Sequence, residues 1–181
     1  MLIKKLILKN KLLILVAGYS GSGKTYLSHR LAKKVQVVYV DKDEINDVFT
    51  FRRTNSIHKE FKDYAYKIMY AITSINLKLG NSVVMDAPFT QKQLGNTEWV
   101  EFIKGFAKNH NTKIKVLWCE APNHIRKERI LKRNNERDIE RYEKLDEFIS
   151  RAEKLSIPVE YQVVETSKIN WPRILSFLEI N

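Results

Sequence analysis

Residues 12–27 read LLILVAGYSGSGKTYL, and this stretch decides the fold. It begins with an unbroken apolar run over residues 12–17, which is typical of a strand buried on both faces of a parallel sheet. Apolar positions recur at helical spacing from Lys24 onward. The three glycines between these segments have no side chains to pack in a core, so we expect the loop to be shaped around a ligand.

The spacing of this loop, GYSGSGKT, is G-x-x-x-x-G-K-[ST], with Gly18 and Gly23 at its fixed ends. Such a loop turns consecutive backbone N–H groups inward, and the helix that follows adds its positive end, so the loop binds phosphate. Lys24 is expected to reach the β- and γ-phosphates of ATP, and the Thr25 hydroxyl to bind Mg²⁺. A glycine-rich turn with an accidental lysine is the alternative, but the flanking strand and helix favour the nucleotide site. The residues expected on the nucleotide within this loop are Gly18, Ser20, Gly21, Ser22, Gly23, Lys24, Thr25 and Tyr26.

The composition fits a single α/β domain over residues 1–181, because 44% hydrophobic and 29% charged residues are ordinary for a folded protein. The one cysteine, Cys119, excludes an internal disulfide and stands in the apolar run KVLWCE, which predicts a buried thiol and fits a reducing cytoplasm. Lysines interrupt the apolar N-terminal run, so we expect strand material there and neither a signal peptide nor a membrane segment.

Apolar runs and helical stripes alternate along the rest of the chain. Buried strands are expected over residues 12–17, 35–41, 82–89, 113–122 and 159–165. Helices are expected from Lys24, over 59–79 with Gly80 as a C-terminal cap, and over 99–110, 125–138, 139–155 and 171–180, the last with Pro172 in its first turn. This alternation predicts a three-layer α/β sandwich of the P-loop NTPase class, with about five parallel strands, helices on both faces and ligands at the carboxyl ends of the strands.

Two acidic residues follow the second and third of these strands, on the edge of the sheet that carries the glycine-rich loop. Asp86 ends the run VVMDAP, the form of a carboxylate that holds Mg²⁺ directly or through water, although a polar strand end is the alternative. Asp43 is expected to orient an acceptor hydroxyl and to take its proton. Its neighbours Asp41 and Glu44 are also candidates for that base, and an N-cap role for Asp43 is the competing interpretation.

Four arginines, Arg126, Arg129, Arg133 and Arg137, are spaced three, four and four residues apart. On a helix they share one side, where their mutual repulsion is unfavourable unless an anion such as a triphosphate lies beside them. They predict an arginine-rich lid over about residues 126–140, in which Arg129 and Arg133 stabilise charge that develops during transfer and Arg133 and Arg137 bind the nucleotide. Arg126 lies farthest from the two asparagines that break this helix, so we expect it to contribute least. A solvated basic face is the alternative for one or two of the four.

Four segments, GYSGSGKT, VDKDEI, VVMDAPF and RILKRNNERD, together resemble in order and spacing the small P-loop kinases of the AAA_33 type, over most of residues 10–140. That family includes the kinase domains of polynucleotide kinases, chloramphenicol phosphotransferase and the zeta toxins. The resemblance implies a kinase fold with an arginine lid, and it places the loop lysine and threonine on nucleotide and metal. It also implies that Asp43 is the base that activates an acceptor hydroxyl and that Arg129 and Arg133 belong to the lid.

The segment after the second strand departs from this resemblance in one position. Polynucleotide kinases look similar through a segment RDDYR, whereas this chain has KDEIN, so Asn46 stands where an arginine would contact the substrate. The end of a nucleic acid is therefore not a favoured acceptor.

These features together predict an ATP-dependent kinase that moves the γ-phosphate to a hydroxyl of a small molecule or nucleotide. The resemblance implies that its acceptor pocket is built by about residues 46–70. The competing class is a nucleotide-hydrolysing switch or binding module, which needs no acceptor base. The net charge of +11 favours an anionic ligand or partner, although a solvated basic surface explains it nearly as well. A nucleic-acid binder is less favoured, because the aromatic residues between Phe49 and Tyr70 follow a helical stripe typical of a core.

Overall fold

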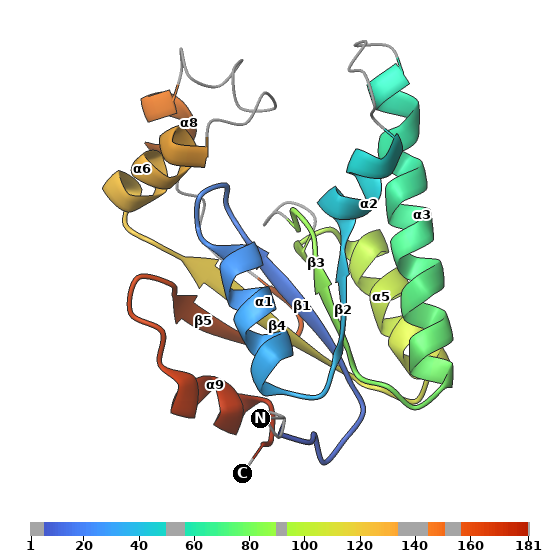
Figure 1. Ribbon diagram of the computed structural model, residues 1–181. Helices are drawn as coiled ribbons and strands as arrows, with labels where there is room; N and C mark the ends of the chain where they lie inside the picture. The colour runs from blue at the N-terminus through green and yellow to red at the C-terminus, as the bar shows by residue number, and fades with distance from the viewer. Residues whose placement is uncertain (1–5, 50–56, 90–93, 134–144, 151–156, 181) are drawn as a thin grey trace.

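The computed structural model describes residues 6–49, 57–89, 94–133, 145–150 and 157–180. These residues contain one parallel sheet with the strand order β2-β3-β1-β4-β5 (Figure 1). The strands are β1 Leu12–Gly18, β2 Val38–Asp41, β3 Val83–Asp86, β4 Lys113–Glu120 and β5 Tyr161–Glu165. All five lie within or around the expected segments, so the predicted α/β fold is confirmed. The strand order reverses beside β1, and such a reversal creates a ligand crevice at the carboxyl ends of the strands.

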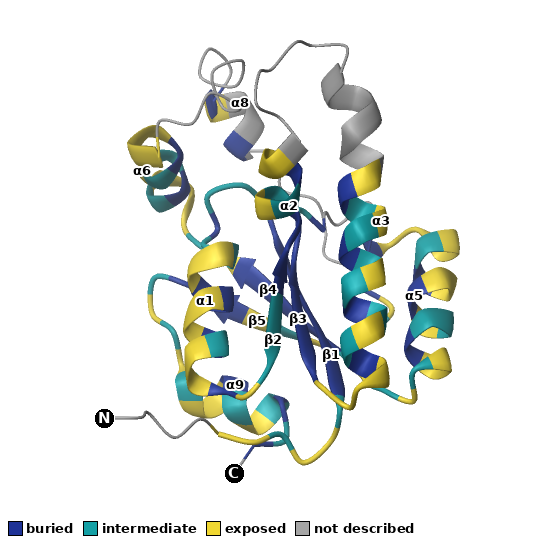
Figure 2. Cartoon of the chain, turned by 45° about the vertical axis from the view of Figure 1, so that its right-hand side comes forward, coloured by how far each residue is buried: buried dark blue, intermediate teal, exposed yellow. Residues whose placement is uncertain are grey.

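Helices cover both faces of the sheet. They are α1 Lys24–Lys34, α2 Lys42–Phe49, α3 Ile57–Lys78, α5 Thr97–Asn109, α6 Asn123–Arg133, α8 Leu145–Ser150 and α9 Trp171–Phe177. The α1 and α9 helices share one hydrophobic core with the sheet, and α3 and α5 share the other. Figure 2 shows the buried strands between these two helical layers. In Figure 1, α6 and α8 stand over one side of the loop that follows β1, and α2 and α3 stand over the other.

The central strand β1 explains the unbroken apolar run of the sequence. Its side chains are fully buried and alternate between the two cores, with Leu13 and Leu15 toward α3 and α5 and with Ile14 and Val16 toward α1 and α9. A strand covered on both faces needs apolar side chains at every position. The neighbouring Cys119 on β4 is also buried, as predicted, and burial raises the pKa of its thiol to about 12.

The chain enters α2 directly from β2, so this helix begins earlier than an N-cap at Asp43 would place it. Asp41 ends the strand and caps the helix, because its Oδ1 accepts hydrogen bonds from the backbone N–H groups of Asp43 at 2.7 Å and Glu44 at 3.3 Å. The N-cap interpretation of Asp43 is therefore wrong, and that role belongs to Asp41.

Two predicted helix ends are confirmed. Gly80 follows α3 with a φ of 88°, and its N–H donates to the Leu77 carbonyl at 3.2 Å, as in a glycine C-cap. Pro172 lies in the first turn of α9. Most of the expected helix over 139–155 lies outside the described residues, and the described part of it forms α8. Among the described helices, none is both long and apolar enough to cross a membrane.

Candidate functional site

The loop between β1 and α1 wraps around the ammonium group of its own lysine. Lys24 Nζ donates hydrogen bonds to the carbonyl oxygens of Gly18 at 3.0 Å and Tyr19 at 3.1 Å. Removal from water lowers the pKa of Lys24, and the nearby charge of Asp86 offsets part of that shift. Gly23 precedes α1 in the left-handed conformation, at φ 87° and ψ 24°, with no side chain to cap the helix. The loop thus brings a lysine and a helix N-terminus together, which suits phosphate.

Glycines in this loop also allow other elements to approach it closely. A Cβ on Gly21 would lie 2.6 Å from the backbone carbonyl oxygen of Arg126 in α6. A Cβ on Gly23 would lie 2.8 Å from Thr166 Oγ1, in the segment after β5. Both positions have positive φ angles, so a larger residue would be strained as well as crowded. The glycine spacing therefore fits a phosphate cradle and is also required by the packing of α6 and the segment after β5.

Arg126 links α6 to the loop by a hydrogen bond. Its side chain is buried, and Nε donates to the Ser20 carbonyl at 3.1 Å while Nη1 donates to the Ile149 carbonyl at 3.2 Å. That Arg126 contributes least to the reaction stays a prediction, but the structure gives it contacts with the loop that its distance from the break did not indicate. Arg126 holds the backbone of the phosphate loop.

Arg129 and Arg133 meet the same loop from α6. Arg129 Nη1 donates to the Gly21 carbonyl of the loop at 3.4 Å and to Thr166 Oγ1 at 2.8 Å. Arg133 Nη2 donates to Ser20 Oγ at 3.4 Å. The helical spacing therefore brings three of the four arginines into contact with the loop between β1 and α1. Arg137 and the rest of the expected lid, 134–140, lie outside the described residues.

Thr166 is a residue of this site that sequence reasoning missed. It is buried just after β5, and its hydroxyl donates to the Ser22 carbonyl at 2.6 Å and accepts a hydrogen bond from Arg129. Its backbone N–H donates to the Glu120 carbonyl at 2.9 Å, so it ties β4, the loop and α6 together. The available signal was its position after the carboxyl end of the last strand, where α/β sites gather.

Acidic residues at the ends of β2 and β3 lie side by side next to the loop. Asp41 and Asp86 are paired in the strand register, and Tyr39 Oη donates to Asp41 Oδ2 at 2.6 Å and to Asp86 Oδ2 at 3.4 Å. Burial, and then the charge of Asp41, raise the pKa of Asp86 to about 6, although Lys24 and a hydrogen bond with Thr25 act in the opposite direction.

The contact between Thr25 and Asp86 provides a test of the expected magnesium site. The structure brings a hydroxyl oxygen and a carboxylate together through a side-chain hydrogen bond, and it sets them beside the loop lysine. Hydroxyl, carboxylate and phosphate oxygens are the ligands that Mg²⁺ prefers. The residues present therefore fit the ion.

Asp43 lies in the first turn of α2, on the side of the loop away from α6 (Figure 1). Its carboxylate Oδ1 is 3.1 Å from the ammonium of Lys42, and about two fifths of its side chain is exposed. The charge of Asp43 acts on the pKa values of both Lys24 and Asp86, so it belongs to the same electrostatic cluster. Lys42 is a second residue that sequence reasoning missed.

The remaining candidates lie at the edges of this cluster. Tyr26 is exposed on α1, where Arg30 donates to its hydroxyl and stacks 5.3 Å from its ring centroid. Glu44, the alternative base, is exposed on α2, whereas Asn46 is buried. Of the three acids at this turn, Asp41 is occupied as a cap, which leaves Asp43 as the better candidate for a base.

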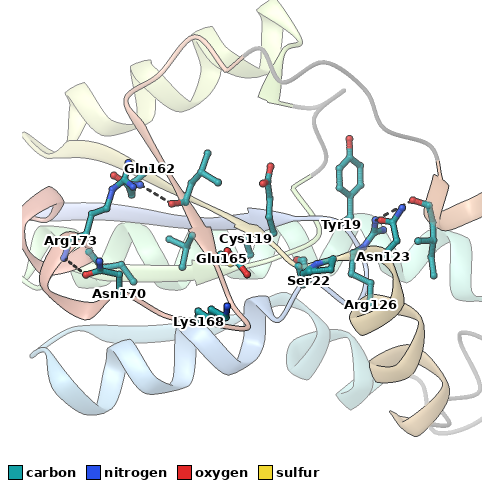
Figure 3. Close-up of a pocket in the computed structure, with 17 residues that line it drawn as sticks. Tyr19, Ser22, Cys119, Asn123, Arg126, Gln162, Glu165, Lys168, Asn170 and Arg173 are labelled. Carbon is teal, nitrogen blue, oxygen red and sulfur yellow. Dashed lines mark hydrogen bonds between the residues drawn. The ribbon is translucent and has the colours of Figure 1, made fainter.

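A cavity of about 720 Å³ lies on the α6 side of the loop. Figure 3 shows Tyr19, Asn123 and Arg126 at one end of it and Gln162 and Arg173 at the other. The cavity is bordered by the phosphate loop at Tyr19 and Ser22, but Asp43 and Asp86 lie outside its lining. Its volume is within the range of small-molecule sites.

Comparison with known proteins places this geometry in a family. The family model for AAA_33, an AAA domain, matches residues 13–168. No curated protein sequence matches the chain. Among solved structures, a presumed kinase of Chloroflexus aurantiacus j-10-fl is similar over 94% of this chain and 98% of its own, with 20% identity and a TM-score of 0.75.

Two further structures share the fold. A sugar kinase of Janibacter sp. HTCC2649 covers 94% of this chain and 95% of its own, at 16% identity and a TM-score of 0.61. Kti12 of Chaetomium thermophilum, solved with ADP-AlF3, covers 92% and 95%, at 18% identity and a TM-score of 0.56. At these identities the likeness shows the common fold alone.

Proposed function

The chain belongs to the AAA_33 family, and we propose that it is an ATP-dependent phosphotransferase that moves the γ-phosphate to a hydroxyl of a small molecule or nucleotide. The observation that carries this proposal is the meeting of three groups: the loop with Lys24, the Thr25–Asp86 pair, and Asp43 on the far side from α6. A site that only bound nucleotide would use the first two groups. A further carboxylate in the same electrostatic cluster suits an acceptor.

In the proposed reaction, the bond between the γ-phosphorus and its bridging oxygen breaks as a bond to the acceptor oxygen forms. The Asp43 carboxylate takes the hydroxyl proton, while the loop N–H groups and Lys24 bind the phosphates. Lys24 is already directed into the loop by its bonds to two loop carbonyls, from which its ammonium would turn to phosphate oxygens. Mg²⁺, held by Thr25 and Asp86, would neutralise phosphate charge and fix its geometry.

The lid side of the site suits the nucleoside end of ATP. If the acceptor lies beside Asp43, the nucleoside leaves the loop toward α6, where the cavity of about 720 Å³ adjoins Tyr19 and Ser22. Arg129 and Arg133 approach the loop from that helix and would meet charge that grows during transfer. A reducing cytoplasm, where ATP is abundant, is the compartment that this proposal implies.

Replacement of Asp43 by Asn tests the proposal. Asp43→Asn keeps the size of the side chain but removes the proton acceptor, so the affinity for MgATP should remain within about twofold while transfer falls by roughly 10²–10⁴-fold. Nucleotide affinity is measured by calorimetry, and transfer is measured with a hydroxyl compound selected from a screen for ATP-dependent phosphorylation. Asp47→Asn, exposed on the same helix, is the matched control and should retain full transfer.

The two classes of function give different results in this experiment. A kinase phosphorylates a member of the hydroxyl screen and loses that activity in Asp43→Asn. A switch protein hydrolyses ATP, leaves every compound of the screen unmodified, and hydrolyses ATP at its normal rate in the variant. Normal transfer by Asp43→Asn would mean that the base is a different carboxylate, and Glu44→Gln would then be measured.

A further inference from the structure

Lys42 is buried next to the proposed base, and neither the phosphate loop nor the metal pair accounts for it. It is the first residue of α2, and only 5% of it is exposed. Its ammonium lies 3.1 Å from Asp43 Oδ1 and 5.7 Å from the ring centroid of Tyr66 on α3. Lys42 therefore lies between the helix that carries Asp43 and the long helix α3 beside it.

A buried ammonium is unfavourable unless a partner compensates for the water that it loses. Here the partner is a carboxylate that remains about two fifths exposed, and the ammonium also lies over the face of an aromatic ring. The chain thus buries the cation and leaves the anion accessible. In a surface ion pair, by contrast, both groups remain in water. Burial of the cation alone suits a pair whose anion has to contact another molecule.

We propose that Lys42 is a positioning residue for the phosphotransfer reaction: it holds the Asp43 carboxylate ionised and oriented toward the acceptor hydroxyl. This inference rests on the proposed function, because it takes Asp43 as the base. Lys42 acts through Asp43 and contacts neither nucleotide nor acceptor in this role.

The charges around Asp43 give Lys42 its effect. The groups that act on Asp43 include Lys42 beside it, Lys24 from α1, Asp41 and Asp86 from the strand ends, and Tyr66 from α3. Without Lys42, the ammonium next to Asp43 would be gone while the carboxylates of Asp41 and Asp86 would remain. An ionised Asp43 would then be less favoured, and its side chain would lose the ion-pair contact at 3.1 Å.

The first test measures Asp43 directly, in the free protein. The ¹³Cγ resonance of Asp43 is followed by NMR as a function of pH in wild type, Lys42→Met and Lys42→Arg. The titration midpoint of Asp43 should move upward by about one pH unit in Lys42→Met, and Lys42→Arg should restore most of the change. Lys33→Met, an exposed lysine on α1, is the control and should leave the midpoint unchanged. A midpoint that is the same in folded Lys42→Met as in wild type would overturn the proposal.

Circular dichroism shows whether each variant folds. If Lys42→Met does not fold, Lys42→Gln, which keeps a polar head group, replaces it in both tests with the same expected shift.

The second test places Lys42 in the reaction by a double-mutant cycle, with MgATP and water as the acceptor, measured as phosphate release. Lys42→Met should lower the rate by roughly tenfold in the wild-type background and leave MgATP affinity within about twofold. In the Asp43→Asn background it should have no further effect, because its target is gone. An equal loss in both backgrounds would show that Lys42 acts independently of Asp43. An Asp43→Asn protein with normal transfer would instead contradict the base assignment, whatever Lys42 does.

Discussion

Lys24 and Asp86 carry charges that folding moves partly out of water before any nucleotide binds. Burial lowers the pKa of Lys24 and raises that of Asp86 to about 6, so in both residues the charged form is disfavoured. Each offsets part of the shift of the other, but the effect of burial remains the larger one. The site is therefore electrostatically unfavourable in the free protein, and a phosphate and a metal ion would relieve this on binding.

Replacement of Asp86 by Asn should therefore stabilise the free protein in a pH-dependent way. Between its ordinary pKa of 3.8 and about 6, the folded state keeps a proton on Asp86 that the unfolded state has lost, so stability falls as the pH rises through this window. Above it, Asp86→Asn should unfold with a free energy about 1–3 kcal/mol higher than wild type, and below about pH 4 the difference should vanish. Urea unfolding in the presence of EDTA measures both limits.

Adding MgATP provides the functional control for this prediction. Wild type should gain stability from the ligand and Asp86→Asn should gain less, because the variant has lost a metal ligand. A variant that is no more stable than wild type at about pH 8 without ligand would contradict the role of burial in this pKa shift.

At the scale of elements, α6 is joined to the phosphate loop by arginines with different surroundings. Arg126 is buried and bonded to backbone carbonyls, whereas Arg133 is exposed and contacts the loop through the Ser20 hydroxyl. A buried guanidinium that holds backbone contributes to the shape of the loop. An exposed guanidinium beside the loop is able to contact the negative charge that develops on the phosphoryl group during transfer.

Two substitutions in α6 should separate these roles. Arg133→Ala should lower the rate of transfer more than it weakens MgATP binding, because its guanidinium meets charge that grows in the transition state. Arg126→Met should destabilise the protein by about 1–3 kcal/mol, because it leaves buried carbonyls unpaired. Calorimetry, single-turnover kinetics and urea unfolding measure the three quantities. An equal loss of binding and rate in Arg133→Ala would identify a ground-state contact.

Elements defined by local pattern could be predicted from the sequence. The apolar runs specify all five strands, and the loop motif specifies where the first strand ends and the first helix begins. The start of α2 could not be fixed from the sequence, because several residues of the cluster DKDE after Val40 are able to cap a helix. Asp41 is identified as the cap of this helix only by the structure, in which its carboxylate accepts hydrogen bonds from two backbone N–H groups.

Contacts between distant parts of the chain could not be predicted in the same way. Thr166 bonds to Ser22, 144 positions away, and no local pattern marks a threonine for that role. Lys42 is buried because α3 packs beside it, and the sequence gives no sign of that packing, since Lys42 stands in a cluster of charged residues. By contrast, Asp86 ends a strand beside the loop, and strand order alone brings it close to Thr25.

At the scale of the whole molecule, the net charge of +11 does not distinguish between a nucleic acid and ATP as the anionic ligand. Part of this charge lies near the loop, which is contacted by the side chains of Lys24, Arg126, Arg129 and Arg133. A compact site that combines loop N–H groups with cationic side chains suits a small anion. Binding to a polyanion would instead depend on lysines and arginines spread over the surface, and such binding is highly sensitive to salt.

We therefore expect a single-stranded DNA oligonucleotide with a 5′-hydroxyl to bind without being phosphorylated. Its affinity should fall by roughly tenfold or more between about 50 and 200 mM KCl, because each phosphate contact releases a counterion. Transfer of label from ATP to the 5′-hydroxyl should be absent, because Asn46, where polynucleotide kinases have an arginine, is buried in α2 and carries no charge to hold the end of the strand. Fluorescence anisotropy and a radiolabel assay measure the two quantities in the same buffers. Salt-resistant binding together with labelling of the 5′ end would show instead that the acceptor is a nucleic acid and that residues other than Asn46 hold it.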